Sequence, residues 1–244
     1  MTYCIALRLH GGLVLLSDTR TNAGVDNIST YRKLHVLLAG EDRLFALQSA
    51  GSLATTHQVL DRIAHDLRSG AQDSLATVES LAEAALYVGR LGWEIARSHA
   101  EALPGGAARA TFILSGQVGD EDPDILLVYP EGNFIRASED KPYLQTGESK
   151  YGKFMLDLAV QPDTPITTAT KIAVASMIST ARANLSVGPP YDLGIYVPGA
   201  FVLHQFRIEA DSELLSDLRE LWERHVHLAV AEMPLVQIDL EPLS

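Results

Sequence analysis

The chain has 244 residues and a formal net charge of −12, from 19 basic and 31 acidic side chains. This acidic balance argues against nucleic acid and anionic membranes as partners, because binding to phosphate needs a basic face. The single cysteine, Cys4, excludes an intrachain disulfide, and neither a signal-peptide pattern nor an apolar run of about 18 residues is evident. We therefore expect a cytoplasmic protein without a membrane span.

The first part of the chain predicts strands. Residues 3–10 alternate with a period of two, two glycines then supply a turn, and residues 13–17 complete a hairpin. Residues 33–38 and 44–48 predict two more strands. The later elements predicted from the same patterns are helices over 53–67 and 81–95, strands over 110–114, 125–129 and 134–137, helices over 151–159 and 169–183, strands over 195–197 and 201–208, and an amphipathic helix over 214–226.

The predicted helices occur in consecutive pairs instead of following each strand. This order is not a βαβ pattern, and it favours two antiparallel sheets stacked face to face with a helical layer outside each. The expected fold class is therefore α+β, a four-layer αββα sandwich with an extra C-terminal helix. We expect one domain over residues 1–210 and a helical extension over 211–244 that packs on the same domain.

Thr2 directly follows the initiator methionine, which is readily removed when the next residue is small. A threonine at a free N-terminus carries a nucleophilic hydroxyl and a general base, its own α-amine, on one residue. The reference pKa of an α-amine is about 7.7–8.0, so part of it is neutral near pH 7. Cys4 lies within a strand pattern and is expected to be a small buried residue. No cofactor or metal is expected, since His225, His227 and Glu232 lack the spacing of a zinc protease.

An ordered set of segments carries a family resemblance. Thr2, the turn at 17–20, Lys33 and the stretch 49–54 before a helix together resemble the proteasome β-type peptidase family, whose members have the αββα fold of N-terminal-nucleophile hydrolases. The residues at 21–33 and at 184–188, the chain length and the C-terminal helix resemble a bacterial, proteasome-related branch of that family that is longer than the HslV-type peptidase.

The resemblance implies a role for each matching residue. Thr2 would attack a peptide carbonyl, and Lys33 beside it would favour the alkoxide. Asp18 would orient Lys33, and Arg20 would support the turn. The backbone N–H of Gly51 would point into an oxyanion hole.

Two further positions are implied by the same resemblance. Ser149, in the stretch 146–152, is the best match to the residues that bind the amine of the nucleophile. For the later supporting position Asn184, Ser186 and Asp192 are all candidates between which the sequence does not choose, and Ser186 is included with Arg20 among the supporting residues.

The function implied is an N-terminal threonine hydrolase that cleaves peptide or amide bonds through an acyl-enzyme on Thr2. It would work in a self-assembled ring-like or helical multimer on peptides or unfolded protein, with an ATPase unfoldase as a partner by analogy. One alternative is a proteasome-like structural subunit without catalysis. Another is a small-molecule amidase on the same fold.

Overall fold

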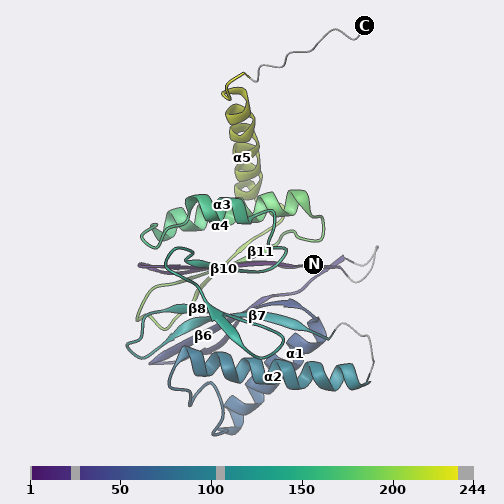
Figure 1. Ribbon diagram of the computed structural model, residues 1–244, viewed down its shortest axis with the longest axis vertical. Coiled ribbons are helices and arrows are strands. Elements are labelled where there is room, and N and C mark those ends of the chain that lie inside the picture. Colours follow the sequence, from purple (N-terminus) through teal and green to yellow (C-terminus); the bar gives the residue numbers. More distant parts are fainter. Residues whose placement is uncertain (1, 23–27, 103–107, 236–244) are drawn as a thin grey trace.

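Two five-stranded antiparallel sheets lie face to face between two layers of helices (Figure 1). The structure, a computed structural model, describes residues 2–22, 28–102 and 108–235. In spatial order the first sheet contains β10 (Tyr143–Gly147), β1 (Tyr3–Leu9), β2 (Gly12–Asp18), β11 (Tyr191–Tyr196) and β12 (His204–Ile208). The second contains β5 (Leu34–Ala39), β6 (Arg43–Gly51), β7 (Ala110–Val118), β8 (Asp124–Val128) and β9 (Phe134–Arg136). A short pair, β3 (Arg20–Asn22) and β4 (Ile28–Thr30), lies apart from both sheets.

The helices cover the outer faces of the sheets in pairs. Helices α1 (Leu53–Ser69) and α2 (Leu81–Ala102) pack on the second sheet, and α3 (Lys153–Ala159) and α4 (Ile166–Ala183) pack on the first (Figure 1). The expected α+β fold, an αββα sandwich of antiparallel sheets, is confirmed.

Strand β1 is buried on both of its faces, and this decides which way Thr2 points. Tyr3 and Ile5 belong to the apolar cluster beneath α4, whereas Cys4 and Ala6 belong to the cluster between the two sheets. Side chains alternate across a strand. Thr2 therefore shares the orientation of Cys4 and opens toward the second sheet.

The sequence patterns missed three strands. Strands β3 and β4 are too short for a period of two to be recognised. In β10, apolar and polar side chains alternate only weakly. Strand β10 is decisive for the site, because it pairs with β1 next to Thr2, with Tyr3 opposite Gly147. Two predicted strands are also displaced, since β11 begins well before residue 195 and β12 begins after residue 201. The first and last residues of these strands are set by hydrogen bonds to neighbouring strands, and a local sequence pattern carries no information on those neighbours.

Helix α5 (Glu213–Ala231) projects away from the sandwich beyond α3 and α4 (Figure 1). Buried Leu215 in its first turn and an ion pair at 3.0 Å between Arg182 on α4 and Glu223, near the middle of α5, hold it to the domain. Packing of the whole extension 211–244 on the domain stays a prediction, because residues 236–244 lie outside the described part of the chain. No helix in the described ranges is both long and apolar enough to cross a membrane.

Candidate active site

A cavity of about 330 Å³ lies where β1 begins, between the two sheets. Its lining brings together three residues that the sequence had assigned to a site, Thr2, Lys33 and Gly51. The other lining residues come from β3, β6, β10 and the start of α1. They are Thr21, Ser49, Ala50, Leu53, Thr56 and Gly147.

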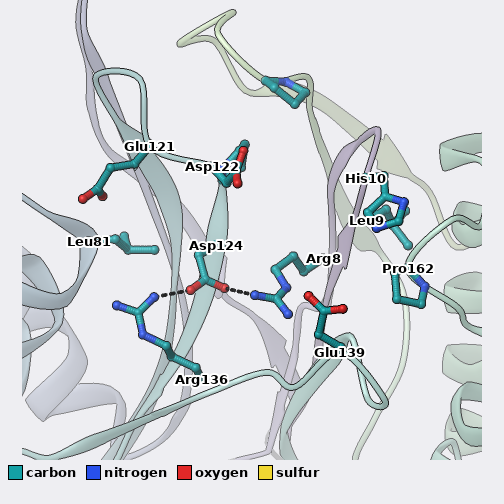
Figure 2. Close-up of a pocket in the computed structure, with 12 residues that line it drawn as sticks. Arg8, Leu9, His10, Leu81, Glu121, Asp122, Asp124, Arg136, Glu139 and Pro162 are labelled. Carbon is teal, nitrogen blue, oxygen red and sulfur yellow. Dashed lines mark hydrogen bonds and ion pairs between the residues drawn. The ribbon is translucent and has the colours of Figure 1, made fainter.

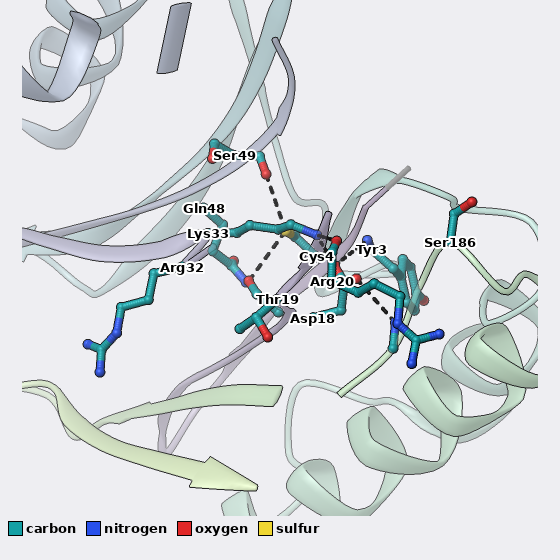
Figure 3. A network of polar contacts seen from close by, with 12 residues as sticks. Tyr3, Cys4, Asp18, Thr19, Arg20, Arg32, Lys33, Gln48, Ser49 and Ser186 are labelled. Atoms are coloured by element: carbon teal, nitrogen blue, oxygen red, sulfur yellow. Dashed lines mark hydrogen bonds and ion pairs between the residues drawn. The ribbon is translucent and has the colours of Figure 1, made fainter. Parts of the chain in front are cut away.

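Asp18 and Lys33 form a buried ion pair beside this cavity (Figure 3). The Nζ of Lys33 lies 2.7 Å from Oδ1 of Asp18, and it also donates to the backbone carbonyl of Arg20 at 2.7 Å. Asp18 is fully buried and Lys33 is 5% exposed. An ammonium has three donors, so these two bonds leave one N–H of Lys33 for the cavity that it lines.

The backbone around Asp18 fixes its carboxylate. Oδ1 accepts the N–H of Tyr3 at 3.0 Å, and Oδ2 accepts the N–H of Gly188 at 3.3 Å. Burial raises the pKa of the Asp18 carboxyl, while Lys33 and these two N–H groups act in the opposite direction. Both oxygens are therefore engaged, and the carboxylate orients Lys33 instead of facing the cavity.

Arg20 holds the loop that carries Ser186. Its Nη1 donates to the carbonyl of Leu185 at 2.8 Å. Its guanidinium also lies so close to Gly188 that a Cβ there would come within 2.3 Å of the guanidinium carbon. The loop in turn gives the N–H of Gly188 to Asp18. Arg20 is thus linked to the ion pair at two points, through its own carbonyl and through this loop.

Gly51 ends β6 immediately before the N-terminus of α1. Its φ of 102° is strained for a residue with a side chain, and a Cβ would lie 2.5 Å from the carbonyl oxygen of Arg109. Ser52 then caps α1, accepting the N–H of Thr55 on its side-chain oxygen. Glycine is therefore required here by the backbone, and the helix N-terminus beside it favours negative charge.

Solved structures of high similarity extend over the whole chain. Anbu (ancestral beta-subunit) from Yersinia bercovieri is 39% identical, with 97% of this chain and 100% of that chain covered and a TM-score of 0.90. The chain belongs to the Anbu family. An Anbu (Gly-1) mutant from Hyphomicrobium sp. strain MC1 is 40% identical over 98% of this chain and 100% of that chain, with a TM-score of 0.90.

The Anbu complex from Pseudomonas aeruginosa, solved as a helical assembly, is 38% identical over 96% of this chain and 98% of that chain, with a TM-score of 0.90. No family model and no curated protein matches the chain. The resemblance to proteasome β-type proteins, and to a bacterial branch of them, is confirmed as membership of the Anbu family. Of the residues 21–33 that carried the resemblance, 23–27 lie outside the described part of the chain.

The stretch 146–152 of this Anbu-family chain reaches Thr2 through its backbone. The N–H of Glu148 donates to the carbonyl of Thr2 at 2.7 Å. Gly147 has a φ of 85°, and a Cβ there would lie 2.0 Å from the same carbonyl oxygen. Ser149, the predicted match to the amine-binding residues, is exposed and is not among the residues that line the cavity. Gly147 was not predicted as a site residue, because the local pattern of residues 143–147 did not predict β10.

The three candidates for the later supporting position do not lie together. Ser186 donates its backbone N–H to Oδ1 of Asn184 at 3.0 Å, in the loop that reaches Asp18. Asp192 lies on β11 and pairs with Arg207 of β12 at 3.2 Å, and burial raises the pKa of its carboxyl. Asn184 and Ser186 therefore belong to the surroundings of the site, whereas Asp192 is engaged with a neighbouring strand.

Cys4 lies beneath Lys33 and is fully buried (Figure 3). Ser17 donates a hydrogen bond to its sulfur at 3.3 Å, and burial raises the pKa of the thiol to about 12. A thiol in this state holds its proton and is a poor nucleophile. Within the described residues, no group of three or more His, Cys, Asp or Glu side chains is placed to hold a metal ion.

A second cavity, of about 440 Å³, lies at the opposite end of β1 (Figure 2). Its centre is Asp124, which accepts from Arg8 at 3.3 Å and from Arg136 on its other oxygen. Glu139 and His10 stand at its edge. The central carboxylate is neutralised by two guanidinium groups, and none of the described residues that line the cavity is Ser, Thr or Cys. The cavity at Thr2 differs in that a hydroxyl and an ammonium both line it.

Proposed function

We propose that this Anbu-family protein is an N-terminal threonine hydrolase acting on peptide or amide bonds once Met1 has been removed. The observation that carries the proposal is one cavity lined by Thr2, Lys33 and Gly51, with the buried Asp18–Lys33 pair beside it. A nucleophile, a cation next to it and an orienting carboxylate form the chain of groups that activates a hydroxyl.

In the acylation step, Oγ of Thr2 attacks the carbonyl carbon of the substrate and a new C–O bond forms. The hydroxyl proton passes to the α-amine of Thr2, and the charge of Lys33 favours the developing alkoxide. The carbonyl oxygen becomes an oxyanion, for which the N–H of Gly51 is the proposed donor. The C–N bond then breaks, the leaving amine takes the proton, and an ester of Thr2 remains.

In the deacylation step, water attacks this ester and gives its proton to the α-amine. The C–O bond to Thr2 breaks, Oγ regains a proton, and a carboxylic acid is released. The charge of Lys33 acts strongly here because the group is almost fully buried, where screening by water is weak.

Self-association is part of the proposal. Leu214, Leu221 and Leu228 recur every seven residues along α5, and all three are exposed. A seam with this spacing is typical of helices that pair with other helices. The Pseudomonas aeruginosa relative forms a helical assembly, which supports a multimer for this chain too. The substrates would be peptides or unfolded segments, and an ATPase unfoldase stays a prediction from the resemblance.

The activity test is the intact mass of the protein before and after incubation with a peptide epoxyketone. We expect a mass without methionine that then gains one inhibitor. Thr2→Ala should abolish the gain, whereas Thr168→Ala, a change on the exposed side of α4, should leave it intact. Protein that lacks Met1 and forms no adduct would refute the hydrolase and favour the structural subunit. A comparison of small amides with peptides as substrates separates the peptidase from the amidase.

The assembly test uses the α5 seam. We expect a Leu221→Glu, Leu228→Glu double variant to have a smaller mass in light scattering than the parent protein, because two charges would enter an apolar contact. Ser216→Glu, on another face of the same helix, is the matched control. Equal masses for all three proteins would exclude the seam as the contact.

A further inference from the structure

The backbone of Glu148 lies against that of Thr2. The N–H of Glu148 donates to the carbonyl of Thr2 at 2.7 Å, and this bond flanks the Tyr3–Gly147 pair, the last pair of the β1–β10 ladder. In an antiparallel pair joined in this way the two residues face each other with both their N–H and their C=O groups. The nitrogen of Thr2, which becomes the free amine, is therefore on the side of Glu148.

The side chain of Glu148 is held by the end of α4. Its Oε2 accepts Nδ2 of Asn184 at 3.0 Å, and its Oε1 accepts the N–H of Lys150 at 3.4 Å. Asn184 is itself fixed, since it caps α4 by donating its N–H to Thr180 and accepts the N–H of Ser186 on Oδ1 at 3.0 Å. Two opposed bonds to one amide group set its orientation, so Asn184 presents an N–H to the carboxylate.

The charged side chains around Thr2 come from separate elements. Lys33 precedes β5 and lines the cavity, and Asp18 ends β2 with both oxygens already engaged. Arg20 of β3 is turned to the loop at Leu185. Glu148 is a further carboxylate beside Thr2, and within the described part of the chain its side chain accepts from the amide of Asn184 and the backbone N–H of Lys150, both uncharged.

We propose that the carboxylate of Glu148, oriented by Asn184, is the counter-charge that holds the α-ammonium of Thr2, the role that the sequence assigned to Ser149. This inference rests on the proposed function, because it requires Thr2 to be the first residue. Glu148 acts here as a positioning residue, since it acts through the amine. An anion beside an ammonium stabilises the charged form, whereas the like charge of Lys33 opposes it. The α-ammonium of Thr2 must lose a proton before it can act as a base, and the charge of Glu148 makes this loss require a higher pH.

The test measures the amine itself, apart from hydrolysis. In protein whose first residue is Thr2, as verified by mass, the pH dependence of acylation of the α-amine gives its pKa. We expect Glu148→Gln, which keeps the shape and removes only the charge, to lower that pKa by about one unit. Asn184→Ala should lower it by less. Glu139→Gln, an exposed position at the other end of β1, is the matched control and should leave the pKa unchanged.

Hydrolysis provides a second measurement. The acidic limb of kcat/KM should move to lower pH by the same amount in Glu148→Gln. An amine whose titration is the same in Glu148→Gln and in the parent would overturn the inference. A lowered amine pKa in a protein that cleaves no substrate would support the inference and refute the proposed function, so the two failures are distinguishable.

Discussion

The two ends of β1 each hold a carboxylate bound by cations, yet they differ in what they can do. At the start of the strand, fully buried Asp18 binds one ammonium and two backbone N–H groups. At its other end, Asp124 is shared by Arg8 and Arg136, whose side chains are 27% and 51% exposed. The first arrangement leaves the cation facing a cavity with a hydroxyl, and the second neutralises the acid.

The difference shows that burial and surroundings, more than the pair itself, decide the chemistry. A charge near the surface is screened by water, and exposed pairs typically contribute about 0–1 kcal/mol. A charge in the interior is screened far less. Lys33 therefore acts strongly on whatever shares its cavity, whereas Arg136 acts mainly on Asp124.

The largest effect is expected when Lys33 is replaced. Lys33→Met should slow adduct formation at Thr2 by roughly a thousandfold, a typical value for the loss of a group that assists proton transfer. It should also destabilise the fold by about 3–5 kcal/mol, because Asp18 would remain buried and unpaired. Lys171→Met, at an exposed site of α4, is the control. Adduct rates and urea unfolding check both values, and an unaffected rate would remove Lys33 from the mechanism.

A slightly smaller effect is expected from a methyl group at Gly51. Gly51→Ala should reduce the adduct rate by about a hundredfold or more, since the backbone that carries the proposed oxyanion donor must shift to avoid the carbonyl of Arg109. Gly70→Ala is matched in backbone type, with a φ of 65° and open space at the Cβ. It should cost only about 1–2 kcal/mol of stability and leave the rate unchanged. Equal rates in the two variants would exclude the proposed role of Gly51.

The pH dependence should separate activity from stability at the Thr2 end. Because burial raises the pKa of Asp18 above its ordinary value of 3.8, this carboxyl takes up a proton in the folded protein before it would in the unfolded chain. Its own contribution to stability thus increases as the pH falls through that window, while the pairing with Lys33 is lost. We expect adduct formation to fail at a higher pH than the fold does, as measured by adduct rates and circular dichroism on the same samples.

The smallest effect on activity is expected at the other end of β1. Asp124→Asn should leave the adduct rate within twofold of the parent value. It should lower stability by about 1–2 kcal/mol, because Arg8 and Arg136, both in partial contact with water, lose the charge of the partner that they share. Thermal unfolding and the same inhibitor assay provide the comparison with Lys33→Met. A large loss of activity would mean that the two ends of β1 are coupled.

Local patterns were sufficient for most of the architecture. Period-two runs and paired helical segments predicted the sandwich, because each strand and helix has one face of apolar side chains that is buried. The spacing of these side chains can be read from the segment itself. Strand β10 escaped because Gln145 and Thr146 weaken its alternation, and its place is set by pairing with β1. Strands β3 and β4 escaped because three residues each are too few to show an alternation.

The sequence by itself determined which groups could carry the chemistry: Thr2 next to the initiator methionine, followed by Asp18, Lys33 and Gly51 in a familiar order. Only the tertiary structure decided how they meet, by burying Asp18 against Lys33 and opening the cavity at Thr2. It also brought Asn184 and Glu148, 36 positions apart, into contact, and left Ser149 in solvent. The physical reason is that contacts between segments far apart in the sequence come from packing, which no local stretch of sequence encodes.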